Sequence, residues 1–255
     1  MRKVISFAVI IFCICTLPLL AKDESKIPNH VVSIELQNTS KQLKEEQSTM
    51  EPSEQTKELM ESIDMKLDNE ELIKMLNETT IKPSPIALGY RGNIFLGHWP
   101  LHYKSVESKV NWEFQLINVN EVNNYGGDKP VSVHYDQKEE KHVKGGLTVK
   151  AQKVDQIMKM IISEAEKKHS FPLTFHATYG KGTKLSQTYD VAVNKVGALK
   201  AYAPVLQEKG HVTFGEVYLE LKGSKKNLVI KNVTKQEVGA FIPIENHVAF
   251  SYKSS

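Results

Sequence analysis

Cysteine and arginine are nearly absent from this sequence of 255 residues. The two cysteines, Cys13 and Cys15, lie close to the N-terminus, so the rest of the chain has no thiol. A thiol-free chain has no disulfide, no thiolate nucleophile and no cysteine-ligated zinc. Arg2 and Arg91 are the only arginines, and every other basic residue is a lysine. Because bidentate recognition of phosphate favours arginine, this composition argues against geometric recognition of phosphate groups.

A strong charge of one sign is also missing. The chain has 33 Lys+Arg and 30 Asp+Glu, which gives a formal net charge of +3 and no basic tail for nucleic acid. It is 40% hydrophobic and 8% aromatic, as in soluble globular proteins. This composition excludes collagen-like, disulfide-dense and multi-span membrane classes, and nucleic acid is not an expected partner.

The first 21 residues have the pattern of a signal peptide. A basic start, Arg2 and Lys3, precedes an apolar run over residues 4–20, and a polar segment follows Ala21. We predict cleavage after Ala21. The run also reaches the lower limit of bilayer-spanning length, so an uncut leader would remain as an N-terminal anchor. In both cases residue 22 onward is predicted to be extracytoplasmic, either secreted or anchored, and membrane contact is expected at most through the N-terminal segment.

Aromatic residues are absent between residues 22 and 89, whereas residues 90–255 carry all but Phe7 and Phe12. Charge divides at the same place, because residues 22–89 hold 8 lysines and 14 acids and residues 90–255 hold 23 basic and 16 acidic residues. A polar, charged segment buries too little apolar surface to offset the entropy of ordering it. The sequence therefore predicts a disordered tether over 22–52 and a domain over 53–255, with its main core from about residue 86.

The dominant period beyond residue 86 is two, which is typical of strands with one buried face. Val110, Trp112, Phe114 and Leu116 alternate with polar residues in this way. The same pattern predicts strands over 131–135 and 171–179, a hairpin of 217–221 and 228–233 around a turn at 222–227, and strand over 240–252 with a break near Asn246. The expected fold class is α+β with a predominantly antiparallel β-sheet.

Three helices complete the predicted fold. Apolar residues from Val154 to Ala165 recur at helical spacing, so we expect one long amphipathic helix over about 153–169. Ser53 and Asn69 precede two shorter apolar stripes and suit the N-cap position. Because short amphipathic helices are marginal alone, these two are expected to pack onto the rest of the domain.

No motif for chemistry emerges from the chain, and we predict no catalytic residue, metal site or cofactor. His98 and His102 are four residues apart, but Pro100 between them opposes the helical geometry that a shared metal needs. Nucleophile-elbow, Ser-x-x-Lys and zinc-protease motifs are missing. A serine–histidine or carboxylate pair assembled from distant positions remains open, since active sites converge in space.

Two lysine clusters and one tryptophan are the candidate binding residues. Lysine is a flexible point charge that neutralises polyanions without reading their geometry, and anionic lipid headgroups and wall polymers are the polyanions available outside the membrane. Trp99 offers a stacking surface for sugars or peptides. Both clusters fall in expected loops, and the candidates are Lys138, Lys141, Lys144, Lys222, Lys225, Lys226 and Trp99.

Four blocks of the sequence, 86–103, 144–148, 202–204 and 215–218, resemble the YfkD-like family. The most specific is the Leu-Gly-x-Trp-Pro-Leu-x-Tyr stretch that begins at Leu96, and His98 and His102 occupy its variable positions. The likeness runs from about residue 52 to the C-terminus. It implies a bacterial envelope protein with an N-terminal signal segment, and it brings no catalytic role with it.

These observations favour a non-enzymatic envelope protein that binds an anionic envelope component or a protein partner. One alternative is an envelope hydrolase with a dispersed site, which requires a concave pocket with converging polar groups. The other is a scaffold that docks on an integral membrane protein through an exposed sheet edge.

Overall fold

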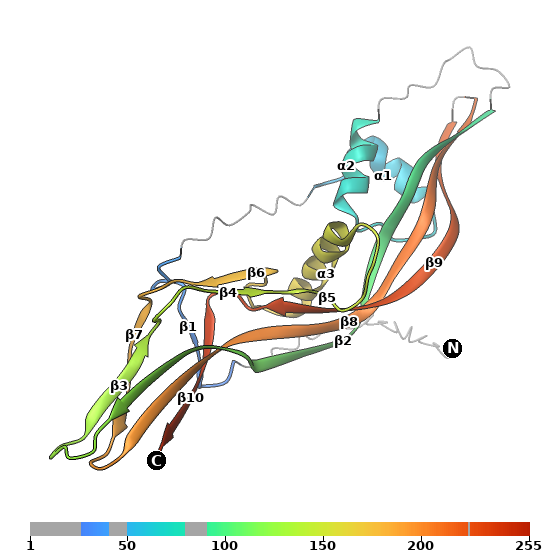
Figure 1. The fold of residues 1–255 in the computed structure, drawn as a ribbon. Coiled ribbons are helices and arrows are strands. Elements are labelled where there is room, and N and C mark those ends of the chain that lie inside the picture. The colour runs from blue at the N-terminus through green and yellow to red at the C-terminus, as the bar shows by residue number, and fades with distance from the viewer. Residues whose placement is uncertain (1–26, 41–49, 80–90, 224) are drawn as a thin grey trace, which may run out of the picture.

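The computed structural model describes residues 27–40, 50–79, 91–223 and 225–255. Antiparallel strands make up most of it, together with three helices, so the fold is β-rich α+β (Figure 1). The predicted leader, its cleavage site after Ala21 and both cysteines lie outside the described residues. Within the described ranges, no helix has the length and apolar character needed to cross a bilayer.

The elements alternate irregularly along the chain, with two helices before the long strands and one between them. The helices are α1 (Glu54–Glu61), α2 (Glu70–Glu78) and α3 (Val154–Lys168). The strands are β1 (Val31–Ser33), β2 (Arg91–Asn123), β3 (Val131–Asp136), β4 (Lys141–Lys144), β5 (Gly146–Leu147), β6 (His176–Tyr179), β7 (Lys184–Val191), β8 (Val196–Lys222), β9 (Lys225–Pro243) and β10 (His247–Ser254).

A ladder between two very long strands organises the molecule. β2 has 33 residues and β8 has 27, and they pair antiparallel from Arg91 opposite Lys222 to Asn123 opposite Val196. β9 pairs with the other edge of β8 over much of its length, and β10 continues that edge. Figure 1 shows β2 and β8 running from one end of an elongated molecule to the other, with β9 along one part and β10 along the other.

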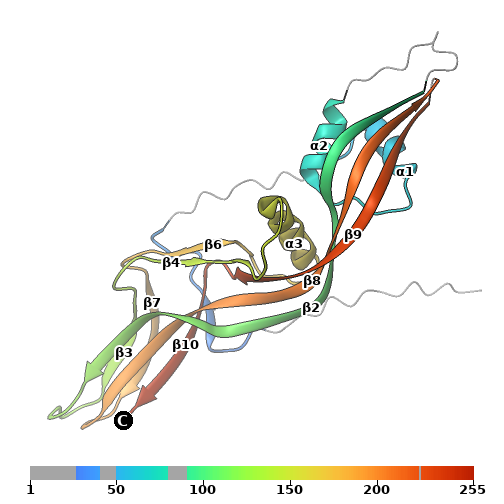
Figure 2. The same ribbon diagram turned by 45° about the vertical axis from the view of Figure 1, so that its right-hand side comes forward.

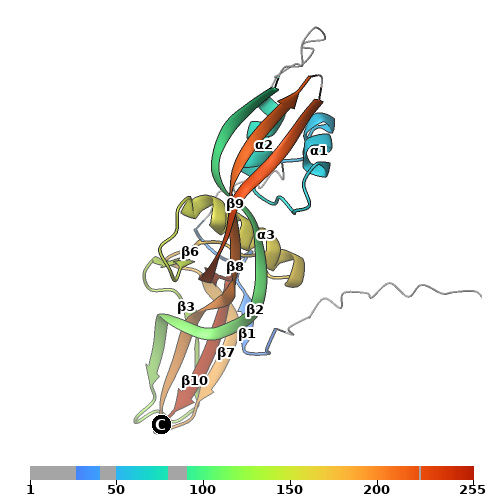
Figure 3. The same cartoon turned by 90° about the vertical axis from the view of Figure 1, so that its right-hand side faces the viewer.

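The sheet is bent and strongly twisted, as Figures 2 and 3 show. Five register shifts interrupt the β2–β8 ladder, and the surplus always lies on β2, with two residues between Asn111 and Gln115 and one residue at each of the other shifts. An extra residue on one strand bends that strand and increases the local twist. The surplus residues of β2 therefore account for the curvature that separates the end covered by α1 and α2 from the end covered by β3 and β7.

Three hydrophobic clusters follow one another along this sheet. The first lies under α3 and includes Tyr103, Ile161 and Phe214. The second lies between the end of the ladder near Asn123 and the strands β3, β4, β6 and β10. The third lies between α1, α2 and the part of β2, β8 and β9 near Arg91, which we call the upper sheet. Leu72 and Leu76 meet Leu101 there. The helices α1 and α2 thus cover the sheet near Arg91, and α3 covers its middle part.

The two short helices, β3 and the break in the final strand confirm the predictions, whereas the strand predicted over 171–179 forms only at β6, His176–Tyr179. The Ser53 side chain accepts a hydrogen bond from the Thr56 amide at the start of α1, and Asn69 caps α2 in the same way. Both helices bury their apolar stripes against the sheet. The alternating residues from Phe171 to Tyr179 are all buried. The final strand breaks at Asn246, which has a φ of 53°.

The strand predicted over residues 110–116 exists, and Val110 and Trp112 pack against the cluster under α3 as predicted, but the predicted burial is wrong for the other two apolar residues. Phe114 and Leu116 are exposed rather than buried, whereas Ile117 is buried. Between Asn111 and Gln115, β2 has two more residues than β8, and between Leu116 and Asn118 it has one more, so the simple alternation does not continue through Phe114 and Leu116. The turn of the β8–β9 hairpin is also shorter than predicted, since pairing continues to Lys222 opposite Lys225.

The tether predicted over 22–52 is wrong for residues 27–40. β1 pairs with β10, and Ile34 is fully buried in the second cluster. The Asn38 side chain donates to the Thr178 carbonyl oxygen and accepts from the Gly180 amide. A few apolar residues suffice here, because the edge of β10 supplies backbone partners for β1 and Ile34 packs among the buried residues of the second cluster. Residues 22–26 and 41–49 lie outside the described ranges.

Candidate functional site

The motif that begins at Leu96 fixes the indole ring of Trp99. The Trp99 Nε1 donates to the Leu96 carbonyl oxygen at 2.9 Å. Between them, Gly97 has a φ of +114°, a region that L side chains rarely adopt, and a Cβ there would lie 3.1 Å from Nε1. A glycine is therefore required at this turn. The hydrogen bond from Nε1 to Leu96 fixes the orientation of the indole ring.

Asn69 joins α2, β2 and α3 beside this ring. It is 1% exposed, and its Oδ1 accepts from the Glu71 and Leu72 amides. Its Nδ2 donates to the Pro100 carbonyl oxygen at 2.7 Å and to Gln156 Oε1 at 2.9 Å. A single buried amide thus satisfies groups on three elements, which sets their relative positions.

Asn69→Ala is expected to lower the free energy of unfolding by about 1–2 kcal/mol, because the α2 N-cap is lost. Denaturant unfolding of the full chain measures this. Asn69→Asp keeps the cap acceptor but removes both Nδ2 donors, so it separates the two roles. Equal stability of Asn69→Asp and the parent chain would show that the bonds to Pro100 and Gln156 contribute nothing.

An open groove of about 470 Å³ lies between α2, α3 and Trp99. Acidic, basic and apolar side chains share its lining, which differs from the mostly apolar lining of small-molecule pockets. The lining residues are Met50, Glu70, Glu71, Lys74, Met75, Glu78, Trp99 and Lys159.

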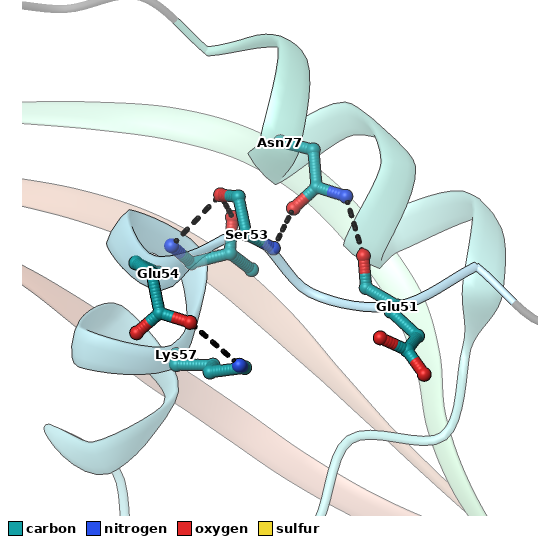
Figure 4. A network of polar contacts seen from close by, with 6 residues as sticks. Glu51, Ser53, Glu54, Lys57 and Asn77 are labelled. Carbon is teal, nitrogen blue, oxygen red and sulfur yellow. Dashed lines mark hydrogen bonds and ion pairs between the residues drawn. The ribbon is translucent and has the colours of Figure 1, made fainter.

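A polar network holds the chain segment at the edge of this groove. The Asn77 side chain on α2 accepts from the Ser53 amide at 2.8 Å and donates to the Glu51 carbonyl oxygen at 3.0 Å (Figure 4). Lys57 pairs with Glu54 on the exposed side of α1 at 2.7 Å. Because residues 51–53 are tied to α2, the preceding Met50 is brought to the groove.

Lys153 occupies the face of the Trp99 ring. Its Nζ lies 3.1 Å from the ring centroid, within the range of a cation–π interaction. The backbone of Lys153 is left-handed, with φ 53° and ψ 48°, and it forms the N-cap of α3 without a side-chain cap bond. Burial lowers the pKa of Lys153, and the nearby Glu71 carboxylate opposes this shift.

A second surface, which we call the open face, lies on the side of the upper sheet opposite α1 and α2. Directly paired residues share a face, and four cross-strand rows of β2, β8 and β9 point away from the helices. Figure 3 looks onto this side, with the two helices behind the strands. From the hairpin end inward, the rows are Arg91, Lys222 and Lys225; Asn93, Glu220 and Asn227; Phe95, Tyr218 and Val229; His98, Glu216 and Lys231.

Aromatic and cationic side chains adjoin each other on the open face. Phe95 is 56% exposed and its ring centroid lies 5.1 Å from that of Tyr218. Lys231 Nζ lies 4.8 Å from the Tyr218 ring centroid. The Tyr218 hydroxyl donates to Glu216 at 2.8 Å, and this bond lowers the pKa of the Glu216 carboxyl. The Glu216 carboxylate is thus hydrogen-bonded within the sheet, whereas the Phe95 ring is accessible to solvent.

The structure separates the two predicted lysine clusters. Lys138, Lys141 and Lys144 lie at and beside β4, whereas Lys222 and Lys225 lie at the far end of the β8–β9 hairpin (Figure 1). The prediction that both clusters are loops is wrong, because only Lys138 among these five lies outside a strand. Extended strands bring their side chains into cross-strand rows, which loops do not.

Each predicted cluster also contains a nearby acid. Lys141 pairs with Glu139 at 3.1 Å, and Lys222 pairs with Glu220 at 3.0 Å. Lys226 pairs in register with Leu221, so it points to the helix-covered side and leaves the second cluster. Arg91 joins that cluster instead, because it lies opposite Lys222. Nothing local in the sequence indicates this partnership across more than a hundred residues.

A serine–histidine pair does form from distant positions, between Ser108 Oγ and His169 Nε2 at 2.7 Å. The His169 ring stacks on Phe171 in the cluster under α3. Neither residue lines the groove beside Trp99 or the smaller pocket between α2 and α3. His169 is buried, Ser108 is partly buried and neither lies in these two pockets, so the pair has the features of a structural contact and gives the hydrolase alternative little support.

The histidines near Trp99 do not share a ligand site. His98 stacks on Phe214, with ring centroids 5.6 Å apart, and His102 Nδ1 lies 3.1 Å from Asp68. Over the part of the chain that the structure describes, no three histidine, cysteine or acidic side chains are grouped as a metal site requires.

One edge of β2 bears on the scaffold alternative. In the described ranges, β2 pairs through one edge only, with β8. The Asp68 amide and the Gln137 side chain contact the other edge at Leu101 and Ile117. The stretch between these contacts is bulged and carries Lys104 and other charges. Bulges and charged side chains both oppose strand addition, so this edge is a poor template for docking.

Comparison with known proteins gives similarity along nearly the whole chain. The family described as YfkD-like protein matches residues 28–255. Uncharacterized protein YfkD of Bacillus subtilis (strain 168) is 47% identical over 238 residues, which cover 93% of this chain and 90% of that protein. Among solved structures, the crystal structure of Lamprey immune protein is similar over 66% of this chain and 54% of that chain, with 6% identity and a TM-score of 0.27. A similarity at that TM-score carries no argument.

Proposed function

The chain belongs to the YfkD-like family, and from this premise we propose that it is a non-enzymatic cell-envelope protein whose open face binds anionic lipid headgroups. The observation that carries the proposal is the row of Arg91, Lys222 and Lys225 at one end of the molecule, above the exposed Phe95. Basic side chains attract an anionic leaflet, and aromatic side chains favour the interface between lipid and water.

The magnitude of this attraction suits a reversible contact. Each lysine or arginine near an anionic membrane surface contributes about 1 kcal/mol, and Glu220 offsets part of the row. The open face alone therefore supports weak binding. An anchored leader would raise the local concentration of the open face at the membrane and make weak binding sufficient.

Vesicle binding of the full chain tests the proposal. Sedimentation with vesicles of phosphatidylglycerol and phosphatidylcholine is expected to fall as salt rises, because screening weakens exposed charges. The double variant Lys222→Glu/Lys225→Glu is expected to bind at least about tenfold more weakly. The matched control is Lys138→Glu/Lys144→Glu, which changes the net charge equally at the other predicted cluster and is expected to bind like the parent.

The outcomes distinguish the alternatives. Equal losses of vesicle binding in the two double variants would show that binding depends on the net charge of the protein and not on the open face. Binding that is indifferent to salt would reject the electrostatic basis. Binding of purified anionic wall polymer through Lys222 and Lys225, with no binding to vesicles, would replace the lipid by the polymer. Phe95→Ser is expected to weaken vesicle binding but to leave its salt dependence unchanged.

The extracytoplasmic location is part of the same proposal, and its support is the apolar run before Ala21. N-terminal sequencing of the native protein after cell fractionation checks it. We expect either a mature chain that begins at Lys22 or an intact leader in the membrane fraction. A native protein in the cytosol with its leader intact would contradict the location and remove the basis for envelope partners.

A further inference from the structure

The Trp99 ring has the properties of a preformed receptor for a cation. Its N–H is bonded to the Leu96 carbonyl oxygen, so the ring is oriented and only its face is available for recognition. A tryptophan face is the most favourable aromatic surface for an ammonium group. A lysine ammonium, that of Lys153, already lies there at 3.1 Å from the centroid.

The backbone that places Lys153 on this ring is unfavourable. Lys153 has a φ of 53°, a left-handed conformation that the side chain of a non-glycine residue disfavours. Lys153 also stands at the N-cap of α3, where a serine, threonine, aspartate or asparagine would bond the first amides and lysine does not. A single cation–π contact stabilises by about as much as a left-handed backbone destabilises, so the two effects nearly offset each other. Lys153 is thus an occupant that a competing cation can displace.

The groove around the ring suits a basic, extended peptide. Its three carboxylates, on Glu70, Glu71 and Glu78, outnumber the two ammonium groups of Lys74 and Lys159 that line it. Lys159 is itself 3.6 Å from Glu71, in an exposed ion pair that is worth little and exchanges easily. The two methionines in the lining add adaptable apolar contacts. A volume of about 470 Å³ also exceeds what one ammonium group fills.

We infer that the groove beside Trp99 binds a basic segment of a partner protein, with a lysine side chain of the partner replacing Lys153 on the indole face. The site lies on the helix-covered side of the sheet, opposite the open face, and does not depend on lipid binding. The molecule would then contact an anionic surface through one side and a basic protein segment through the other.

Displacement of Lys153 is tested with a capped tetralysine peptide as the probe. The full chain with Trp112→Phe leaves Trp99 as the single tryptophan, so its fluorescence reports occupancy of the ring. The expected result is a saturable change that a capped tetraglutamate peptide and sodium chloride of equal ionic strength do not produce. Lys153→Gly frees the ring and suits the left-handed backbone, so tetralysine is expected to bind about threefold to thirtyfold more tightly.

The matched control is Lys150→Gly, which removes the same charge three residues away and is expected to bind like the parent. Trp99→Leu is expected to abolish the binding measured by calorimetry, and circular dichroism checks that this variant stays folded. If Lys153→Gly binds tetralysine no more tightly than Lys150→Gly, Lys153 does not occupy the receptor site and the inference fails. It fails also if a folded Trp99→Leu binds as well as the parent.

Discussion

Leu101→Ala is expected to lower the free energy of unfolding by about 2–5 kcal/mol, as for other fully buried leucines. Leu101 is 0% exposed and is the extra residue of a bulge on β2, where it packs among the α2 leucines and Val217. Its carbonyl oxygen also accepts from the Asp68 amide at 2.8 Å. The cavity left by alanine would lie at the point where both N-terminal helices meet the sheet.

Denaturant unfolding followed by far-UV circular dichroism measures this effect. Val106→Ala is the matched control, because Val106 lies on the same strand and is 66% exposed. Its stability is expected to stay within about 0.5 kcal/mol of the parent. A loss below about 1 kcal/mol in Leu101→Ala would contradict the close packing of α1 and α2 on the upper sheet. Loss of the helical signal before the main transition would show that these helices detach first.

Gly210→Ala is expected to lower the free energy of unfolding by about 3 kcal/mol, the upper end of the range for overpacking. A Cβ at Gly210 would lie 2.3 Å from the Lys104 carbonyl oxygen and 2.5 Å from the Tyr103 hydroxyl. The first neighbour is backbone, so the β2–β8 ladder must shift. The second is a buried phenol whose pKa is raised by burial and by the nearby Glu208 carboxylate, so its movement would disturb a buried polar contact.

Gly146→Ala is the matched control, because a Cβ there has no atom within 4 Å and the backbone needs no positive φ. Thermal unfolding of both variants gives the comparison. A Gly210→Ala chain as stable as Gly146→Ala would mean that β2 and β8 do not approach each other as closely at Gly210 as the structure has them.

Local patterns in the sequence predict where helices and strands lie better than they predict which strands pair with each other. Ser53 and Asn69 indicate two helix starts because a cap acts within three residues. The alternation from Phe171 to Tyr179 gives the correct buried face, since no bulge interrupts it. At Phe114 the same reasoning fails, because a bulge depends on the strand opposite.

The candidate sites were only partly predictable for the same reason. Trp99 emerged from its residue type, but the cation on its face comes from Lys153, whose left-handed backbone has no signature in a lysine. The burial of Ile34 is not predictable from composition, because composition averages over a segment and does not register one apolar residue that packs in the second cluster. Asn69 was predicted as a cap, but its bonds to Pro100 and Gln156 follow from the tertiary fold alone.

The β2–β8 ladder also determines how the chain must fold. Residues 124–195 separate the two strands, and β2 pairs with no other strand in the described ranges. Contacts between residues so distant in sequence require closure of a large loop first, which makes folding slow, on the order of milliseconds to seconds. The β8–β9 hairpin is local and can form early, leaving β2 as the last long strand to join. A chain delivered N-terminus first would therefore expose β2 until β8 arrives, and this interval is when a chaperone would be of most use.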